Sequence, residues 1–226
     1  MQSPSRKKFS VGNPKKFVNR KIVAWVLIGL GLIGLVVSGV LLLSSRNNPK
    51  PPPGISLTHA PSAVKPTPKA VAAYTVAPDL PKYITIPTIS VNEARVVGLG
   101  LLKDGEISNP DNIYDAGWYK ASAKPGQAGA MFIYGHVSSW TANGVFYNLK
   151  KLKAGNQIII SRGDDQTFTY QVVTSKTFPR DAVDMNAVLA PVDPNKPGLN
   201  LMTCTGKVIP GTSDFTERLV VFTSLV

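Results

Sequence analysis

The pattern of hydrophobic and polar residues divides residues 22–226 into three parts. Residues 22–43 form an unbroken run of aliphatic residues and glycines, with Trp25 and Ser38 but no charge. Residues 44–81 are polar and rich in proline, and residues 82–226 are a series of short apolar runs separated by turn-forming residues. The pattern therefore predicts one apolar helix, a linker and one globular domain.

The short runs in residues 82–226 have the length and composition of β-strands, being rich in β-branched and aromatic residues and ending at Gly, Pro, Asn or Asp. The expected strands are Tyr83–Ile86, Ala94–Gly98, Gly129–Gly135, Gln157–Ser161, Thr167–Thr177, Leu199–Cys204 and Arg218–Leu225, with a hairpin turn at Gly163–Gln166. Short helical turns are expected at Gly144–Leu149 and Ala182–Leu189. This predicts an all-β domain, either a sandwich or a closed barrel, and we favour the closed barrel.

The apolar run of residues 22–43 is long enough to cross a membrane. A helix of this length rises about 33 Å, and the hydrocarbon core is about 30 Å thick. Residues 1–21 form a basic tail without an acidic residue, whereas only Arg46 and Lys50 follow the run closely. By the positive-inside rule, we expect a single-pass anchor in the cell membrane, with the N-terminus cytoplasmic and the domain outside the cell.

A cleaved signal peptide is the alternative for the same segment. The apolar region of a signal peptide is usually about 7–15 residues and ends at a small-x-small site. Residues 22–43 are longer, and Leu42–Arg46 makes a poor cleavage site. We therefore expect the anchor to be retained.

The proline-rich segment 44–81 is interpreted as an extracellular stalk. Its composition does not build a core and favours an extended, polyproline-like chain. His59 lies in this segment and is interpreted as a solvated linker residue.

The net charge of +12 raises the question of a nucleic-acid partner. Residues 1–81 hold 11 of the 25 Lys and Arg residues and one of the 13 acidic residues, whereas residues 82–226 hold 14 basic and 12 acidic residues. The globular domain is thus close to neutral, and the basic excess lies beside the expected membrane anchor. We expect no nucleic-acid partner.

Cys204 is the single cysteine of the chain and ends the expected strand Leu199–Cys204. Outside the cell a cysteine usually forms a disulfide, but Cys204 has no partner in this sequence. It is therefore either inert or a nucleophile. His136 follows Gly135 at the end of another apolar strand, and a histidine in such a place is by itself more often structural. Together with Cys204 and the strand-opening Arg218, its catalytic interpretation is favoured.

The three residue types form a chemically sensible group. At pH 7 a thiol with a pKa near 8.5 is about 3% thiolate, and an imidazole with a pKa near 6.5 is about a quarter protonated, so an uncoupled pair is rarely reactive. Arg218 carries a permanent charge that favours the thiolate or the oxyanion formed when the thiolate attacks a carbonyl. His136 would protonate the departing amine and later deprotonate the incoming nucleophile.

Other chemistry finds little support in the sequence. One cysteine and two distant histidines do not make a zinc site, and Lys103 stands where a dinucleotide-binding loop begun by Gly98–Gly100 needs glycine. Asp164–Asp165 is interpreted as a polar hairpin tip. We therefore expect no metal and no cofactor. Aromatic residues can line a peptide groove, although packing is their usual role; they are Trp118, Tyr119, Trp140, Phe146 and Tyr147.

Six short motifs in residues 82–226 occur in the order seen in sortases. They are Tyr83–Pro87, Gly117–Tyr119 followed by Pro125–Gly129, Tyr134–Val137, Gly144–Leu149, Leu201–Cys204 and Arg218–Val221. The domain most resembles the class E and class F sortases of high-GC Gram-positive bacteria. Each motif is weak alone, but together they include the three residues that the chemistry requires.

The resemblance implies a closed eight-stranded β-barrel and a cysteine transpeptidase that acts on surface proteins ending in an LPXTG-like sorting signal. Cys204 would form a thioacyl enzyme, His136 would act as acid and then base, and Arg218 would hold the substrate carbonyl and oxyanion. Thr203, Thr205 and Trp140 are expected to contact the substrate. The resemblance implies as acceptor an amine of a cell-wall precursor or a pilin lysine.

Two other functions remain open from the sequence. A hydrolase would let water resolve the thioester, and a catalytically silent wall-binding or scaffold module would carry an unreactive, buried Cys204. Product analysis with and without an added amine separates the first from a transpeptidase, and labelling of the native thiol tests the second.

Overall fold

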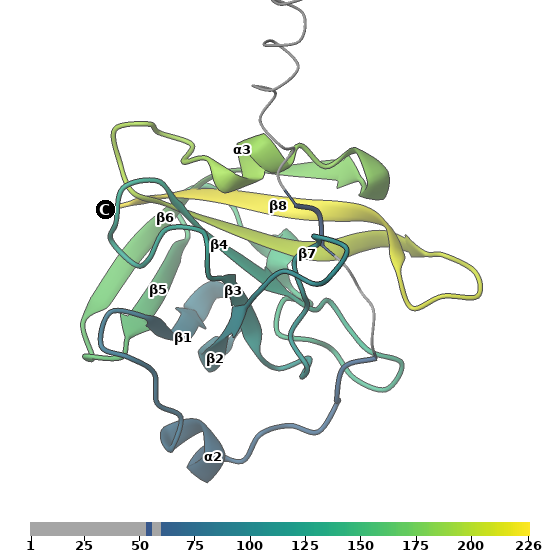
Figure 1. Ribbon diagram of the computed structural model, residues 1–226, viewed down its shortest axis with the longest axis horizontal. Coiled ribbons are helices and arrows are strands. Elements are labelled where there is room, and N and C mark those ends of the chain that lie inside the picture. The colour runs from purple at the N-terminus through teal and green to yellow at the C-terminus, as the bar shows by residue number, and fades with distance from the viewer. Residues whose placement is uncertain (1–52, 56–59) are drawn as a thin grey trace, which may run out of the picture. The chain divides into compact units, whose positions relative to one another are not determined.

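The computed structural model describes residues 53–55 and 60–226, which form a closed β-barrel with short helices around it (Figure 1). Its strands are β1 (Pro81–Ile86), β2 (Val91–Leu99), β3 (Ala116–Tyr119), β4 (Ala130–Gly135), β5 (Gln157–Arg162), β6 (Thr167–Pro179), β7 (Gly198–Val208) and β8 (Phe215–Leu225). The helices are α2 (Pro68–Ala72) and α3 (Met185–Leu189), with 3₁₀ turns at Pro87–Ile89, Leu149–Lys151 and Arg180–Ala182.

The strands follow one another around the barrel in the order β1-β2-β3-β4-β7-β8-β6-β5, and β5 pairs with β1 to close it. The pairs β2–β3 and β4–β7 are parallel, and the other pairs are antiparallel. The prediction of an all-β, closed, eight-stranded barrel is therefore confirmed.

Seven of these strands lie where the sequence pattern predicts them, with ends that differ by a few residues. The hairpin between β5 and β6 is also confirmed: the Arg162 amide donates to the Gln166 carbonyl at 2.8 Å, and Asp165 has a φ of 62°. The pattern missed β3, because a four-residue run cannot be told from a turn without its neighbours. The expected helical turn at Gly144–Leu149 forms its 3₁₀ segment later, at Leu149–Lys151.

The predicted basic tail and membrane anchor lie outside the described residues. Within the part of the chain that the structure describes, no helix is both long enough and apolar enough to span a membrane.

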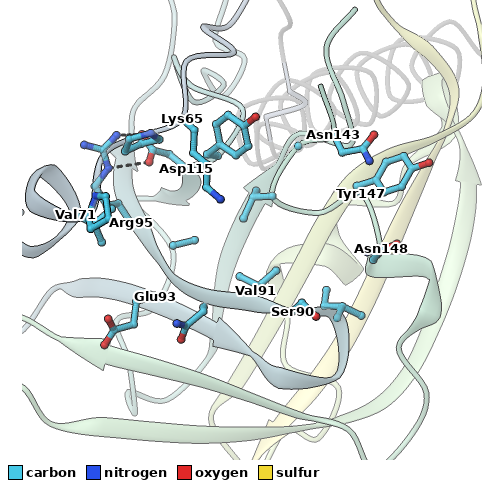
Figure 2. Close-up of a pocket in the computed structure, with 18 of the residues that line it drawn as sticks. Lys65, Val71, Ser90, Val91, Glu93, Arg95, Asp115, Asn143, Tyr147 and Asn148 are labelled. Atoms are coloured by element: carbon cyan, nitrogen blue, oxygen red, sulfur yellow. Dashed lines mark hydrogen bonds and ion pairs between the residues drawn. The ribbon is translucent and has the colours of Figure 1, made fainter. Parts of the chain in front are cut away.

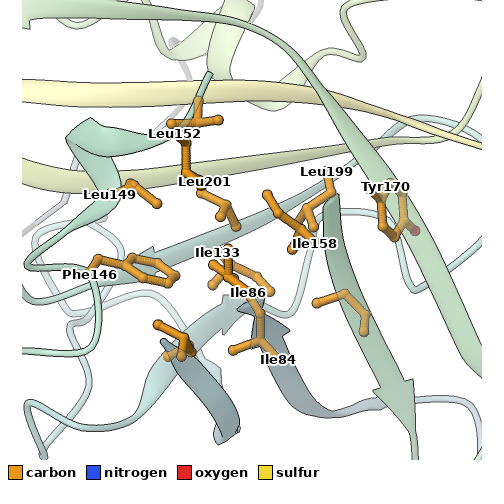
Figure 3. Close-up of a cluster of buried hydrophobic side chains, with 14 of the residues drawn as sticks. Ile84, Ile86, Ile133, Phe146, Leu149, Leu152, Ile158, Tyr170, Leu199 and Leu201 are labelled. Carbon is orange, nitrogen blue, oxygen red and sulfur yellow. The ribbon is translucent and has the colours of Figure 1, made fainter. Parts of the chain in front are cut away.

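Apolar side chains fill the barrel interior, where every second residue of a strand points inward (Figure 3). Ile133 of β4 and Leu199 and Leu201 of β7 meet there (Figure 3). The alternate residues of the same strands form a second buried cluster on the outside of the barrel, which includes Tyr134 and Cys204. Strands β4, β7 and β8 are therefore covered on both faces, which explains their nearly continuous apolar sequence.

The described part of the segment predicted as a stalk lies against the barrel. The Ser62 amide donates to the Asp111 carbonyl at 2.7 Å, and the Tyr74 hydroxyl donates to the Val96 carbonyl of β2 at 2.8 Å. The Tyr83 hydroxyl of β1 in turn donates to the Val71 carbonyl of α2 at 2.5 Å. Residues 60–81 thus form an arm fixed to the barrel, because Tyr74 and several backbone groups of the arm find partners that composition alone does not reveal.

Gly135, the last residue of β4, provides a test of how tightly this region is packed. A Cβ atom at Gly135 would lie 2.7 Å from the Phe146 Cε2 atom and 2.8 Å from the Val145 Cγ1 atom. Because overpacking of this kind costs about 1–3 kcal/mol, we expect Gly135→Ala to lower the melting temperature by about 5 °C. Differential scanning calorimetry measures the effect.

Gly100→Ala is the matched control, since its Cβ atom would approach nothing closer than the Lys120 Cε atom at 3.9 Å. We expect the control to melt within about 1 °C of the parent chain, because surface changes without a clash have small effects. Equal melting temperatures for the two variants would contradict the packing described here.

Candidate active site

The pairing of β4, β7 and β8 brings the three predicted catalytic residues to one face of the barrel. Tyr134 of β4 pairs with Met202 of β7, so His136 and Cys204, each two positions further along, extend the same register on the same face. Cys204 pairs directly with Arg218 of β8. Because side chains alternate along a strand, Cys204 and Arg218 both point outward from the barrel, away from Leu201 and Leu219 in its interior.

Cys204 is buried, with only 4% of its surface exposed. Its sulfur lies 3.2 Å from the hydroxyl oxygen of Tyr134. Burial raises the pKa of the Cys204 thiol above its usual range, while the charge of Arg218 and the hydrogen bond with Tyr134 act in the opposite direction. At neutral pH the thiol is therefore the favoured form of this sulfur.

His136 lies directly after β4 and is also buried. Its Nε2 atom is 2.8 Å from the backbone carbonyl oxygen of Pro110. A carbonyl oxygen only accepts hydrogen bonds, so Nε2 carries a proton, and Nδ1 is the basic nitrogen of the neutral ring. The imidazole also packs at right angles to the ring of Tyr134, with centroids 5.7 Å apart.

Arg218 is held in place by three acceptors around its guanidinium group. Its Nη1 atom donates to the carbonyl oxygens of Phe215 at 3.0 Å and Glu217 at 3.1 Å, and its Nη2 atom donates to Asp214 Oδ1 at 2.8 Å. Asp214 also accepts from Arg180 Nη1 at 3.3 Å. Among the described residues, no hydrogen-bond acceptor is found for the Nε–H or the second Nη2–H of Arg218.

Two adjoining pockets open beside Cys204 and His136. One of about 170 Å³ is lined by Cys204 and Thr205, and another of about 110 Å³ by His136 and Trp140. Ser138 and Phe215 line both pockets, and the residues Ala60 and Pro61 of the arm line the second. The two pockets together form a groove, which we call the catalytic groove.

The residues expected to contact substrate take different places in this groove. Trp140 stands at its rim with 80% of its surface exposed, and Thr205 is half-buried in its wall. Thr203 is buried, and its hydroxyl donates to the carbonyl of Gly135 at 2.7 Å. Thr203 therefore holds the backbone of Gly135, the residue before His136. A contact between Thr203 and the substrate stays a prediction.

A larger pocket of about 850 Å³ lies between the arm and the barrel (Figure 2). Arg95 and Asp115 on its wall form an ion pair at 2.8 Å (Figure 2), and none of the three predicted catalytic residues lines it. Among residues 53–55 and 60–226, no group of three or more His, Cys, Asp or Glu side chains is placed to hold a metal ion.

A comparison with known protein families finds one match that covers more than half of the chain: the model of the sortase domain aligns with residues 84–226. The chain belongs to the sortase family. Sortases are cysteine transpeptidases, and the groove with its single thiol is the part of the barrel suited to that reaction.

Solved structures of other sortases share the fold. The sortase C of Streptococcus pneumoniae is 23% identical, with 78% of this chain and 80% of that chain covered and a TM-score of 0.51. The pilus-related sortase C of Group B Streptococcus is 21% identical, with 76% of each chain covered and a TM-score of 0.51. A search of curated protein sequences returned no match. The assignment of this sortase to class E or class F stays a prediction.

Three groups that surround the predicted catalytic residues were not predicted from the sequence: Tyr134, Asp214 and the carbonyl of Pro110. Tyr134 is two positions before His136, which is the spacing of side chains on one face of a strand, so the pattern held a signal for it. Asp214 lies four positions before Arg218, in a segment interpreted as a loop. The role of the Pro110 carbonyl cannot be read from the sequence, because every residue has a backbone carbonyl.

The environment of Cys204 predicts the pH dependence of its alkylation. Only the thiolate reacts, and burial raises the pKa of this thiol. We therefore expect the rate of reaction with iodoacetamide to keep rising with pH and to reach its midpoint above about 8.5, the value of an ordinary cysteine. Timed mass spectrometry from pH 6 to 11 measures the rate, and the single cysteine makes each label unambiguous.

The same chain unfolded in urea is the control for this measurement, because unfolding removes the burial. Its midpoint should return to the value of an ordinary cysteine. A native midpoint at or below that of the unfolded chain would contradict the environment described for Cys204.

Proposed function

We propose that this sortase is a single-pass membrane enzyme that cleaves an LPXTG-like sorting signal of secreted proteins and joins them to an amine. The observation that carries the proposal is that Cys204 and His136 line one groove, while Arg218 of β8 pairs directly with Cys204 of β7. The apolar run of residues 22–43 and the basic tail before it support the membrane location, with the catalytic domain outside the cell.

The first half of the reaction forms a thioester. Nδ1 of His136 takes the proton of Cys204, and the thiolate sulfur attacks the carbonyl carbon of the Thr–Gly bond in the sorting signal. The carbonyl π electrons move to its oxygen, which the remaining N–H groups of Arg218 stabilise. When the intermediate collapses, the C–N bond breaks, and the leaving amine receives its proton from the imidazolium of His136.

The second half transfers the acyl group to an amine. Neutral His136 takes a proton from the incoming amine, a cell-wall precursor or a pilin lysine, as its nitrogen attacks the thioester carbonyl. The C–S bond then breaks, and a new amide bond replaces the one that was cleaved. The sulfur leaves as a thiolate beside the imidazolium, so a proton returned to sulfur restores the resting enzyme.

The catalytic groove has the character expected for an apolar peptide with few charges. Val208 and Phe215 line it together with Trp140, and Pro61 of the arm borders it. The exposed ring of Trp140 would cover a bound signal, and Thr205 would reach its backbone. These contacts support a sorting signal that contains apolar residues and proline.

The proposal predicts a covalent adduct with a sorting peptide. The full chain, kept in mild detergent, should gain the mass of the acyl fragment of an LPXTG-like peptide, measured by intact-protein mass spectrometry. We expect Cys204→Ala to abolish the adduct and His136→Ala to reduce its rate of formation by at least about 100-fold, since the variants lack the nucleophile and the acid–base group.

Removal of Arg218 should slow the same step by about 100-fold, because the oxyanion loses its charged donors. Arg162→Ala is the matched control: Arg162 is also an ion-paired arginine, bound to Asp164 at the β5–β6 hairpin outside the groove. The control should acylate at the parent rate. The absence of an adduct across a broad library of sorting peptides would overturn the proposal.

A transpeptidase and a hydrolase differ in how the thioester is resolved. We expect added amines, such as triglycine or a lysine peptide, to accelerate the loss of the acyl enzyme and to appear in the product mass. Chromatography with mass detection measures both, with the carboxylic acid product as the internal reference. Acyl-enzyme loss that is indifferent to every amine tested would identify a hydrolase instead.

The burial of Cys204, with 4% of its surface exposed, is the observation that favours the second candidate, a silent wall-binding module on the same barrel. Such a module would form no adduct and would resist alkylation at every pH at which the chain stays folded. The adduct and alkylation measurements therefore separate it from the transpeptidase.

A further inference from the structure

Tyr134 contributes a buried hydroxyl to the mainly apolar second cluster on the outside of the barrel. Its side chain is 0% exposed and packs among residues such as Phe132, Met202 and Phe222. The hydroxyl oxygen lies 3.2 Å from the sulfur of Cys204, which is the polar contact that the structure gives it. A phenylalanine would fill nearly the same space without the free-energy cost of burying a hydroxyl. Packing alone therefore does not account for a tyrosine at this position.

The direction of this hydrogen bond depends on the state of the sulfur. When Cys204 is a neutral thiol, either atom can donate. When the sulfur is a thiolate, it can only accept, and a hydrogen bond to an anion is stronger than one between neutral groups. The contact therefore strengthens when the nucleophile forms.

We propose that Tyr134 is a catalytic residue of this sortase, whose phenol O–H donates to the sulfur of Cys204 whenever that sulfur carries negative charge. The proposal rests on the assignment of Cys204 as the nucleophile. The same ring packs against the imidazole of His136 at 5.7 Å, so a single side chain contacts both the nucleophile and its base.

Other charged groups act on the same sulfur. Arg218 and Asp214, both near the start of β8, respectively lower and raise the pKa of Cys204, and His136 lies beyond the end of β4. Lys150 lines the pocket beside the sulfur. Burial raises the pKa of Tyr134 well above that of an ordinary tyrosine, so its hydroxyl keeps the proton and stays a donor at working pH.

The donated bond has opposite effects on two properties of the sulfur. It increases the fraction of thiolate at a given pH, but it lowers the reactivity of each thiolate, because nucleophilicity falls with a Brønsted slope of about 0.4–0.5 as the thiol pKa falls. The same bond favours departure of the sulfur when an amine resolves the thioester, since a thiol of lower pKa leaves faster.

These opposite effects define the test. Tyr134→Phe should raise the pKa of Cys204 by about one unit, seen as a shift in the pH profile of iodoacetamide labelling and in thiolate absorbance at 240 nm. Below the midpoint, labelling should slow about threefold, since tenfold less thiolate is partly offset by its higher reactivity. Above the midpoint, the limiting rate should rise about threefold, so the two profiles cross.

Tyr170→Phe is the matched control. Tyr170 is also a tyrosine with 0% exposure and one hydrogen bond at its hydroxyl, but it lies inside the barrel, and its partner is the Gly126 amide at 2.9 Å (Figure 3). Its substitution should lower stability without moving the pH profile. A purely structural role for Tyr134 would change access to the sulfur equally at every pH, and the profiles would then not cross.

Replacement of Tyr134 by 3-fluorotyrosine keeps the test open if the phenylalanine variant does not fold. A more acidic phenol is a stronger donor, so the midpoint should move down instead of up. An unchanged midpoint in either folded variant would overturn the role of Tyr134. The alkylation profile tests the role of Tyr134, whereas adduct formation with a sorting peptide tests the proposed function. The two measurements can therefore fail independently.

Discussion

The parallel pairing of β4 with β7 determines where the predicted catalytic residues of this sortase lie. The register from Ala130–Gly198 to Tyr134–Met202 joins segments that are 68 residues apart in the sequence. A slip of one residue would turn each outward side chain of a strand inward, and Cys204 and His136 would no longer share a face. The antiparallel pairing of β7 with β8 then places Arg218 opposite Cys204.

Burial on both faces keeps these strands in one register. Inward residues such as Ile133 and Leu201 belong to the barrel core, and outward residues such as Tyr134 and Met202 belong to the second cluster. A rigid support of this kind suits side chains that must meet within a hydrogen-bond length. It also buries a guanidinium group, whose desolvation is offset by Asp214 and by two backbone carbonyls.

Residues of rare chemical type could be recognised in the sequence, whereas residues whose role depends on their position in the fold could not. Cys204 and His136 stand out because the globular domain holds one residue of each type. Most strands were predictable from alternation and turn residues, but β3 was not, since its pairing with β2 and β4 defines it more than its four residues do. Composition predicted an extended stalk for residues 44–81, whereas specific hydrogen bonds attach residues 60–81, the larger part of it that the structure describes, to the barrel.

The hydrogen bond from Nε2 of His136 to the carbonyl of Pro110 has a consequence for how this enzyme can change over evolution. The acceptor belongs to the main chain, so replacing the side chain at position 110 leaves it in place. The tautomer of the histidine is therefore encoded by the path of a loop and by no single amino acid. Relatives can differ at every side chain of that loop and still hold the imidazole the same way, provided that the loop keeps its course.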